Sequence, residues 1–307
     1  MPYGGLGPLV INMGIIDNIG YAVKFLVECF RMILEDPRLL VPSLLSVVIG
    51  FFVSLVVVVP FIFMGLLGKI GFLAFGGIAL TALFVSYALT YFFTGATSYA
   101  VYQHVRFGKS SLGEAFERAL ANVATLLLLA VTAALIQMLV NMLKGTSNNR
   151  RGAGIVVGLI ASLAADVIKE GWTIAVSLLV PVAVIAQLGY VDTLKRAFDI
   201  VRQNLVIVGA GEVAIRLLVG FIGFVGAAFF IVSAIGLFFL LSPLSPVLAL
   251  AFAVIAFFVG TSIVATLTQF IRTAYYTQVY IWAEDATVHG PAGSTAPPQA
   301  IKNAFSI

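Results

Sequence analysis

Glu212 and Arg216 are the two side chains of this sequence best placed to do chemistry. They are four residues apart, so they share one face of a helix, and apolar residues flank them. A charge at the centre of a bilayer costs about 2.5–3.5 kcal/mol, so at that depth the two would pair and mark a route for an ion or a solute. At headgroup level they would only anchor the helix. This second placement is favoured if an amphipathic helix over 192–204 continues through Arg216.

The other reactive patterns are less complete. The segment 205–214 resembles the start of a dinucleotide-binding glycine turn, but that turn needs a preceding strand and an acidic residue about 20 positions later, and 217–271 contain no acid. The two histidines, His104 and His289, are accompanied by no HExxH, no GxSxG and no carboxylate pair within an apolar run. We therefore expect no catalysis, no metal and no cofactor, and we expect His104 to extend towards a membrane surface.

The composition excludes an ordinary soluble domain. Of 307 residues, 61% are hydrophobic and 10% are charged, whereas soluble domains carry about 25% charged residues. The apolar residues form long uncharged runs, and about 20 such residues are enough for a helix to cross a bilayer. The prediction is an all-α fold, a polytopic transmembrane helical bundle of about six spans.

The uncharged runs give the positions of these spans. The longest run, 217–271, holds two helices because Pro243 and Pro246 break it. Pro181 is expected to kink the fourth span, and 155–165, apolar but too short to cross, is expected to enter the outer leaflet or pack across helix ends. The predicted spans are 39–65, 72–97, 120–143, 172–190, 217–241 and 247–270.

The basic residues predict the orientation and the partner. Most lysines and arginines fall in segments that are cytoplasmic when the N-terminus is inside, which places both termini in the cytoplasm and the protein in the cell membrane. The formal net charge of +4 then favours anionic inner-leaflet lipid as the partner. No nucleic-acid partner is implied, and a soluble partner cannot be named.

Three amphipathic segments precede the predicted hairpins, and each is suited to the cytoplasmic interface. The first covers 14–36. The second begins at Ser111, whose hydroxyl can cap a helix while the Glu114 side chain reaches back to it. The third covers 192–204, and its predicted apolar face consists of Leu194, Ala197, Phe198 and Val201.

The second and third segments also share residue types at matching positions. Ala115-Phe116-Glu117 and Ala197-Phe198-Asp199 each precede an asparagine, Asn122 and Asn204, at a constant offset of 82 (204 − 122). The pattern predicts a threefold internal repeat of one interfacial helix and one membrane hairpin, in units 14–105, 108–190 and 191–283. Together these units form a single transmembrane domain, 1–285, and a cytoplasmic tail follows at 286–307.

Three motifs in and after the fourth span carry a family resemblance: Gly171-Trp172 through Val180-Pro181, Gly189-Tyr190-Val191-Asp192 and Lys195-Arg196-Ala197-Phe198. They resemble the signature of an uncharacterised prokaryotic family of six-helix membrane proteins, a domain of unknown function. That family usually has Ser where this chain has Ala197, and an acid near Gln187. More distantly, the layout is similar to the membrane domains attached to some glycerophosphodiester phosphodiesterases. The resemblance implies a topology and no reaction.

Three classes of function remain open. The first is a non-enzymatic structural, scaffolding or membrane-organising protein, in which Gly220, Gly223 and Gly226 allow helix packing or association of chain copies into a homo-oligomer. The second is a transporter or channel subunit for a small solute or ion that uses Glu212 and Arg216. The third is a membrane enzyme that acts on lipid.

Overall fold

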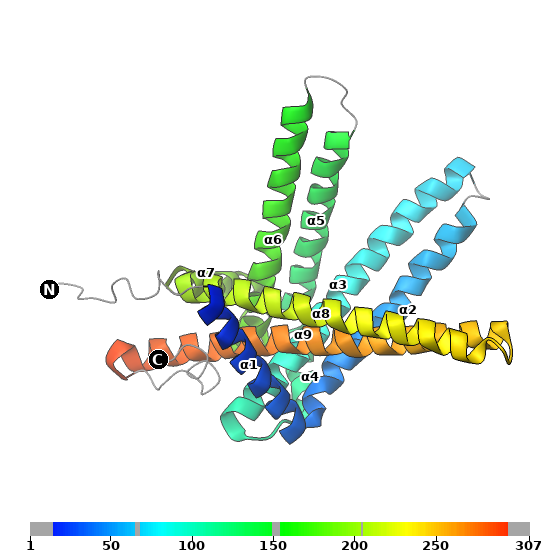
Figure 1. The fold of residues 1–307 in the computed structure, drawn as a ribbon. Coiled ribbons are helices and arrows are strands. Elements are labelled where there is room, and N and C mark those ends of the chain that lie inside the picture. The colour runs from blue at the N-terminus through cyan, green and yellow to red at the C-terminus, as the bar shows by residue number, and fades with distance from the viewer. Residues whose placement is uncertain (1–14, 65–67, 149–153, 204, 294–307) are drawn as a thin grey trace. The chain divides into compact units, whose positions relative to one another are not determined.

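A computed structural model describes residues 15–64, 68–148, 154–203 and 205–293. Within these ranges the chain is helical and contains no strand, so the predicted all-α fold is confirmed. Along the chain, a short helix precedes each pair of long helices (Figure 1). The elements are α1 (Ile15–Glu35), the 3₁₀ helix η1 (Pro37–Leu40), α2 (Val41–Met64), α3 (Gly68–Phe107), α4 (Leu112–Ala121), α5 (Val123–Asn148), α6 (Gly154–Ala186), α7 (Tyr190–Gln203), α8 (Leu205–Leu241) and α9 (Pro246–Gly293).

Five segments of the described ranges are long and apolar enough to cross a membrane. A sixth crossing exists if Ile174–Ala186 and Tyr190–Arg202, which meet at an angle of 118°, form one broken span. The described part of the chain therefore has five helices, or up to six, that could cross a membrane, as expected of a multi-pass membrane protein. The five segments are Pro37–Ser54, Leu80–Phe107, Val123–Leu143, Ile215–Leu241 and Pro246–Asp285.

The chain forms two compact units. Unit 1 comprises α1, η1, His104–Lys109 and the chain from Phe198 onward, and unit 2 comprises 41–103 and 110–197. In unit 1, α8 and α9 form a hairpin and α1 packs against both helices (Figure 1). In unit 2, α5 and α6 form a hairpin of their own. The single domain over 1–285 and the threefold repeat both stay predictions.

The helix α6 differs from the sequence prediction. Residues 155–165 are the first turns of one 33-residue helix, Gly154–Ala186, and not a separate segment, because the isolated polar residues near 166–170 do not break a helix. The helix also continues through Pro181 to Ala186, so a kink at Pro181 stays a prediction. A sharp bend follows at 187–189, where Gln187 has a φ of 55°.

In unit 2, α4 begins at the predicted cap but with an additional partner. Ser111 is the N-cap, and its hydroxyl accepts a hydrogen bond from the Glu114 N–H at 3.4 Å. The Glu114 carboxylate accepts a hydrogen bond from Gln103 Nε2, while Gln103 Oε1 accepts one from the Ser111 N–H at 2.9 Å. In a capping box, the Glu114 side chain would accept a hydrogen bond directly from the Ser111 N–H. Here the side-chain amide of Gln103 lies between the two and bonds to both. The end of α3 is thereby tied to the start of α4.

The predicted apolar face of α7 is divided between the protein interior and the surface. Ala197 is buried, Leu194 and Val201 are half-buried, and Phe198 is 64% exposed. The assignment of the whole face to lipid is therefore wrong for Ala197, whose small side chain packs inside.

Two glycines allow α8 and α9 to approach each other closely. A Cβ added at Gly226 would lie 2.6 Å from Val264 Cγ2, and one added at Gly260 would overlap the ring of Phe230. A Cβ at Gly220 or at Gly223 would meet no described atom within 4 Å. The hairpin contact therefore uses Gly226 together with Gly260, which lies outside the predicted set of glycines.

Replacing Gly260 by leucine is expected to destabilise the hairpin, because the new side chain must displace the Phe230 ring. Overpacking of this kind costs about 1–3 kcal/mol. Gly220→Leu is the matched control, since both substitutions change helix propensity alike and only one meets a neighbour. Thermal unfolding in detergent, followed by circular dichroism, should give the lower midpoint for Gly260→Leu. Equal midpoints would contradict the close approach of the helices.

Candidate functional site

Three side chains of α8 and α9 surround the carboxylate of Glu212. Its Oε1 lies 3.4 Å from Arg216 Nη2 and 3.5 Å from Arg272 Nη2, and its Oε2 accepts a hydrogen bond from the Tyr276 hydroxyl. Glu212 is 5% exposed and Tyr276 is fully buried, whereas the side chains of Arg272 and Arg216 are 35% and 48% exposed. In this group, the Glu212 cluster, the carboxylate is enclosed and the guanidinium groups reach the surface.

The symmetry of the hairpin brings these residues together. Because α8 ends at Leu241 and α9 begins at Pro246, the turn is centred near residue 244. Positions equally far from this centre lie opposite each other, which pairs 216 with 272 (244 ± 28) and 212 with 276 (244 ± 32). Arg272 and Tyr276 are the partners that the sequence analysis missed. The signal that could have found them is this symmetry about the turn between Pro243 and Pro246.

The length of α8 indicates the depth of the cluster in a membrane. Glu212 precedes Leu241 by 29 residues (241 − 212), which is about 44 Å of helix at 1.5 Å per residue. A bilayer is about 30 Å thick in its hydrocarbon core and about 40–45 Å with both headgroup regions. A hairpin whose turn lies at one membrane surface therefore carries the cluster to the headgroup region of the other.

The expected continuation of the amphipathic helix over 192–204 through Arg216 stays a prediction, because α7 is described to Gln203 and α8 from Leu205, and residue 204 between them is not described. Asn204, one of the two asparagines in the repeat pattern, lies outside the described residues.

The Glu212 cluster combines one carboxylate with two guanidinium groups. Arg272 Nη2 makes an ion pair with Glu212 but no hydrogen bond within the described part of the chain. The buried hydroxyl of the neighbouring Tyr275 also has no hydrogen-bond partner there. The cluster therefore keeps donors for an acceptor other than Glu212.

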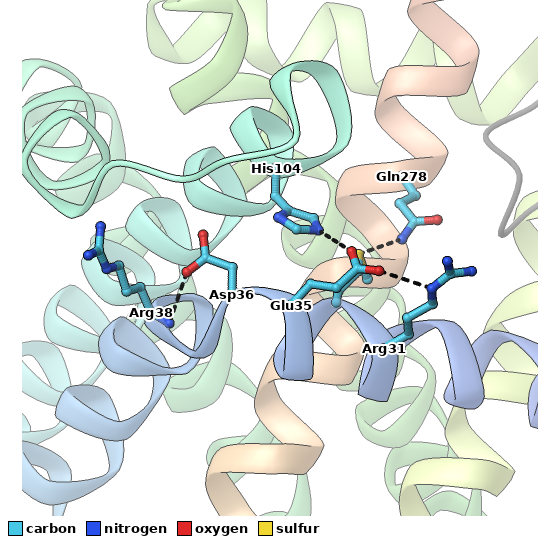
Figure 2. A network of polar contacts seen from close by, with 7 residues as sticks. Arg31, Glu35, Asp36, Arg38, His104 and Gln278 are labelled. Carbon is cyan, nitrogen blue, oxygen red and sulfur yellow. Dashed lines mark hydrogen bonds and ion pairs between the residues drawn. The ribbon is translucent and has the colours of Figure 1, made fainter.

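A second set of polar contacts in unit 1, centred on Glu35, attaches α1 to the end of α3. Figure 2 shows Glu35 between His104 and Arg31: Glu35 Oε2 lies 3.5 Å from His104 Nε2, and Oε1 accepts a hydrogen bond from Arg31 Nε at 3.0 Å. Gln278 of α9 is directed towards Met32, with 3.8 Å between its Nε2 and the sulfur. His104 is 8% exposed. The expectation that it extends towards a membrane surface is therefore wrong, because α1 covers it and supplies its partner.

Aromatic contacts extend the attachment of α1 to the cluster. Phe25 meets the Tyr275 ring edge-on, with centroids 5.6 Å apart, and the Tyr275 and Tyr276 centroids are 5.2 Å apart. Such pairs contribute about 0.5–1.5 kcal/mol beyond the burial of their area. The helix α1 thus contacts Tyr275, whose ring lies against that of Tyr276, the tyrosine that donates to Glu212.

The remaining sequence candidates gain no support from the described residues. The glycine segment 205–214 is the first part of α8 and follows the helix α7, so it lacks the strand that a dinucleotide turn requires. His289 lies in α9, which continues to Gly293 through part of the predicted tail; 294–307 lie outside the described residues. Across the described residues, no three His, Cys, Asp or Glu side chains are grouped so that they could hold a metal ion.

Tyr276→Phe is expected to destabilise the protein, because it removes a buried hydrogen bond to a charged group, a loss of about 1.5–3 kcal/mol. Combined with Glu212→Leu in a double-mutant cycle, it should show a coupling of about 0.5–3 kcal/mol in chemical unfolding from detergent. Ser233→Ala serves as the control, since this exposed hydroxyl bonds only to the Phe229 carbonyl of its own helix. Additive effects of Tyr276→Phe and Glu212→Leu would argue against the contact.

One family of known proteins matches the chain. Residues 75–290 match DUF6159, described as a family of unknown function. No curated protein matches. The matched region covers more than two thirds of the chain (216 of 307 residues, from 290 − 75 + 1) and contains α4 to α8 completely. The predicted resemblance to an uncharacterised family is confirmed in this respect, while the prokaryotic origin and the likeness to phosphodiesterase membrane domains stay predictions. The chain belongs to DUF6159, a family of unknown function.

Proposed function

We propose that this protein is a non-enzymatic membrane organiser of the cell membrane. Its hairpins anchor it, its termini lie in the cytoplasm, and α1, α4 and α7 lie in the inner-leaflet interface. The observation that carries the proposal is the exposure of large apolar side chains on these three helices beside charged ones. The exposed fractions are 82% for Leu34 on α1, 58% for Leu120 on α4 and 64% for Phe198 on α7. Helices with an exposed apolar side and a charged side suit a membrane interface.

The polar groups of the α8–α9 hairpin support an anchoring role. No Asp, Glu, Lys or Arg occurs in 217–271. The hydroxyls of Thr261, Thr266 and Thr268 donate to backbone carbonyls of their own helix. A route for an ion usually needs polar or ionisable groups at membrane depth. The charges that border this uncharged run belong to the Glu212 cluster, and the length of α8 supports a position for the cluster in the headgroup region.

One observation favours the alternative, a transporter or channel subunit. The Glu212 carboxylate is buried and held by two arginines, and groups of this kind can bind and release an ion. A lipid-acting enzyme is the third class, and the resemblance to membrane domains attached to glycerophosphodiester phosphodiesterases brings no catalytic group to this chain.

The interfacial position of α7 is testable with spin labels. A nitroxide at Phe198→Cys should be reached by dissolved oxygen more than by a polar nickel complex in reconstituted vesicles, since the position is 64% exposed on the apolar side. Asp192→Cys, on the charged side of the same helix and 67% exposed, should show the opposite preference. Preferential access of the nickel complex to both positions would mean that α7 lies in water.

The native cysteine does not interfere with this experiment. Cys29 is fully buried, and burial, together with the nearby Glu28, raises the pKa of its thiol well above the usual range. A thiol that stays protonated and enclosed reacts slowly with labelling reagents.

Ion flux separates the organising role from the alternative. Vesicles that contain the wild-type protein should leak protons and potassium ions no faster than protein-free vesicles, because 217–271 of the hairpin contain no charged residue. Wild-type flux that disappears in Glu212→Gln, with Lys195→Gln as the control for loss of an exposed charge, would favour the transporter. Thermal unfolding of Glu212→Gln must be measured alongside, so that loss of flux is not loss of fold.

A further inference from the structure

We propose that the Glu212 cluster binds the phosphate group of an anionic phospholipid, and that Arg216 and Arg272 hold its oxygens. The inference goes beyond the organising role, because it concerns one site on the α8–α9 hairpin and would hold for an anchor or a transporter alike.

The charge of the cluster fits an anion. Two guanidinium groups face one carboxylate, so the group carries a net charge of +1. Glu212 is almost fully enclosed and already accepts from Tyr276. The exposed parts of the two arginines are therefore where a second anion can approach.

Two donors next to Glu212, on Arg272 and Tyr275, fit a ligand that accepts hydrogen bonds. Arg272 Nη2 and the Tyr275 hydroxyl are buried donors without a hydrogen-bond partner in the described ranges. Phosphate oxygens match a guanidinium in pairs, because the planar donors and the oxygens have complementary spacing.

The surface of α8 beside the cluster fits a lipid better than a soluble phosphate. Gly220 and Gly223 lie four and seven residues after Arg216, hence on the same side of the helix, and a Cβ at either would meet no described atom within 4 Å. On one flank of this open strip, Leu217 and Phe221 are 58% and 67% exposed. An acyl chain can lie along these residues while its headgroup phosphate is held by Arg216.

The position along the membrane normal agrees with a headgroup. Arg216 precedes Leu241 by 25 residues (241 − 216), or about 38 Å of helix, which exceeds the hydrocarbon core of about 30 Å. The glycines and the exposed apolar residues follow Arg216 towards the hairpin turn. The hairpin therefore has basic groups at headgroup level and an apolar surface directly next to them.

Lipid titration of the purified full chain in a non-ionic detergent tests the site. The midpoint of thermal unfolding is measured against phosphatidylglycerol, phosphatidylcholine and inorganic phosphate, since a ligand that binds only the folded state raises this midpoint. Phosphatidylglycerol is expected to raise it saturably, and Arg216→Gln should require at least about tenfold more lipid for half the effect, as for loss of a charge-assisted hydrogen bond. Lys195→Gln, which removes an exposed lysine charge elsewhere, should behave like the wild type.

A second variant keeps the test decisive if Arg216→Gln unfolds. Arg272→Lys retains the positive charge but loses the planar pair of donors, so it too should weaken the response to phosphatidylglycerol. Equal weakening by Lys195→Gln would overturn the proposal, because it would show diffuse attraction to the whole basic surface. The proposal would also be overturned if both arginine variants responded to phosphatidylglycerol like the wild type. The same holds if phosphatidylcholine raised the unfolding midpoint of the wild type as much as phosphatidylglycerol does. Inorganic phosphate that alone reproduces the stabilisation would refute the lipid as the source of the phosphate.

Discussion

The hydrocarbon around the spans is the constraint on which the structure of this protein depends. A charged side chain in that medium costs several kcal/mol, and a backbone amide without a hydrogen bond is similarly unfavourable. The chain meets the second requirement with long uninterrupted helices. It meets the first in the α8–α9 hairpin by keeping 217–271 free of charged residues, so that Glu212 and Arg272 meet far from the hairpin turn.

The buried interior of unit 1 follows the same distribution of charge. Along α8, the side chains of Phe221, Phe229 and Leu240 are turned outwards, as expected where lipid replaces a protein neighbour. In α9, most of 270–283 is buried, and α1 contributes Phe25 and Met32 to that packing. The part of unit 1 with a protein-like interior therefore lies beside the charged end of the hairpin. The contact of Glu35 with His104 belongs to the same region (Figure 2).

The sequence predicts those features that local composition and short spacing determine. The uncharged runs locate the spans because lipid acts on every residue of a run alike, and the cap of α4 at Ser111 follows from a three-residue pattern. Contacts between distant segments are different. Gln103 lies 8 and 11 residues from the two groups it joins, and His104 meets Glu35 only because α1 folds against the end of α3. For Arg272 and Tyr276 the sequence holds enough information, but only after the turn at 242–245 is taken as a centre of symmetry.

The helix α9 has a consequence for how the two sides of the membrane communicate. It runs without a described break from Pro246 to Gly293, 48 residues, or about 72 Å, so it is much longer than a bilayer is thick. A rod of this kind transmits rotation along its whole length. Hydrophobic mismatch makes a hairpin tilt when the bilayer thins, and the same tilt must then swing the far end of α9 sideways. A change in bilayer thickness would thus change the lateral position of the far end of α9, outside the bilayer.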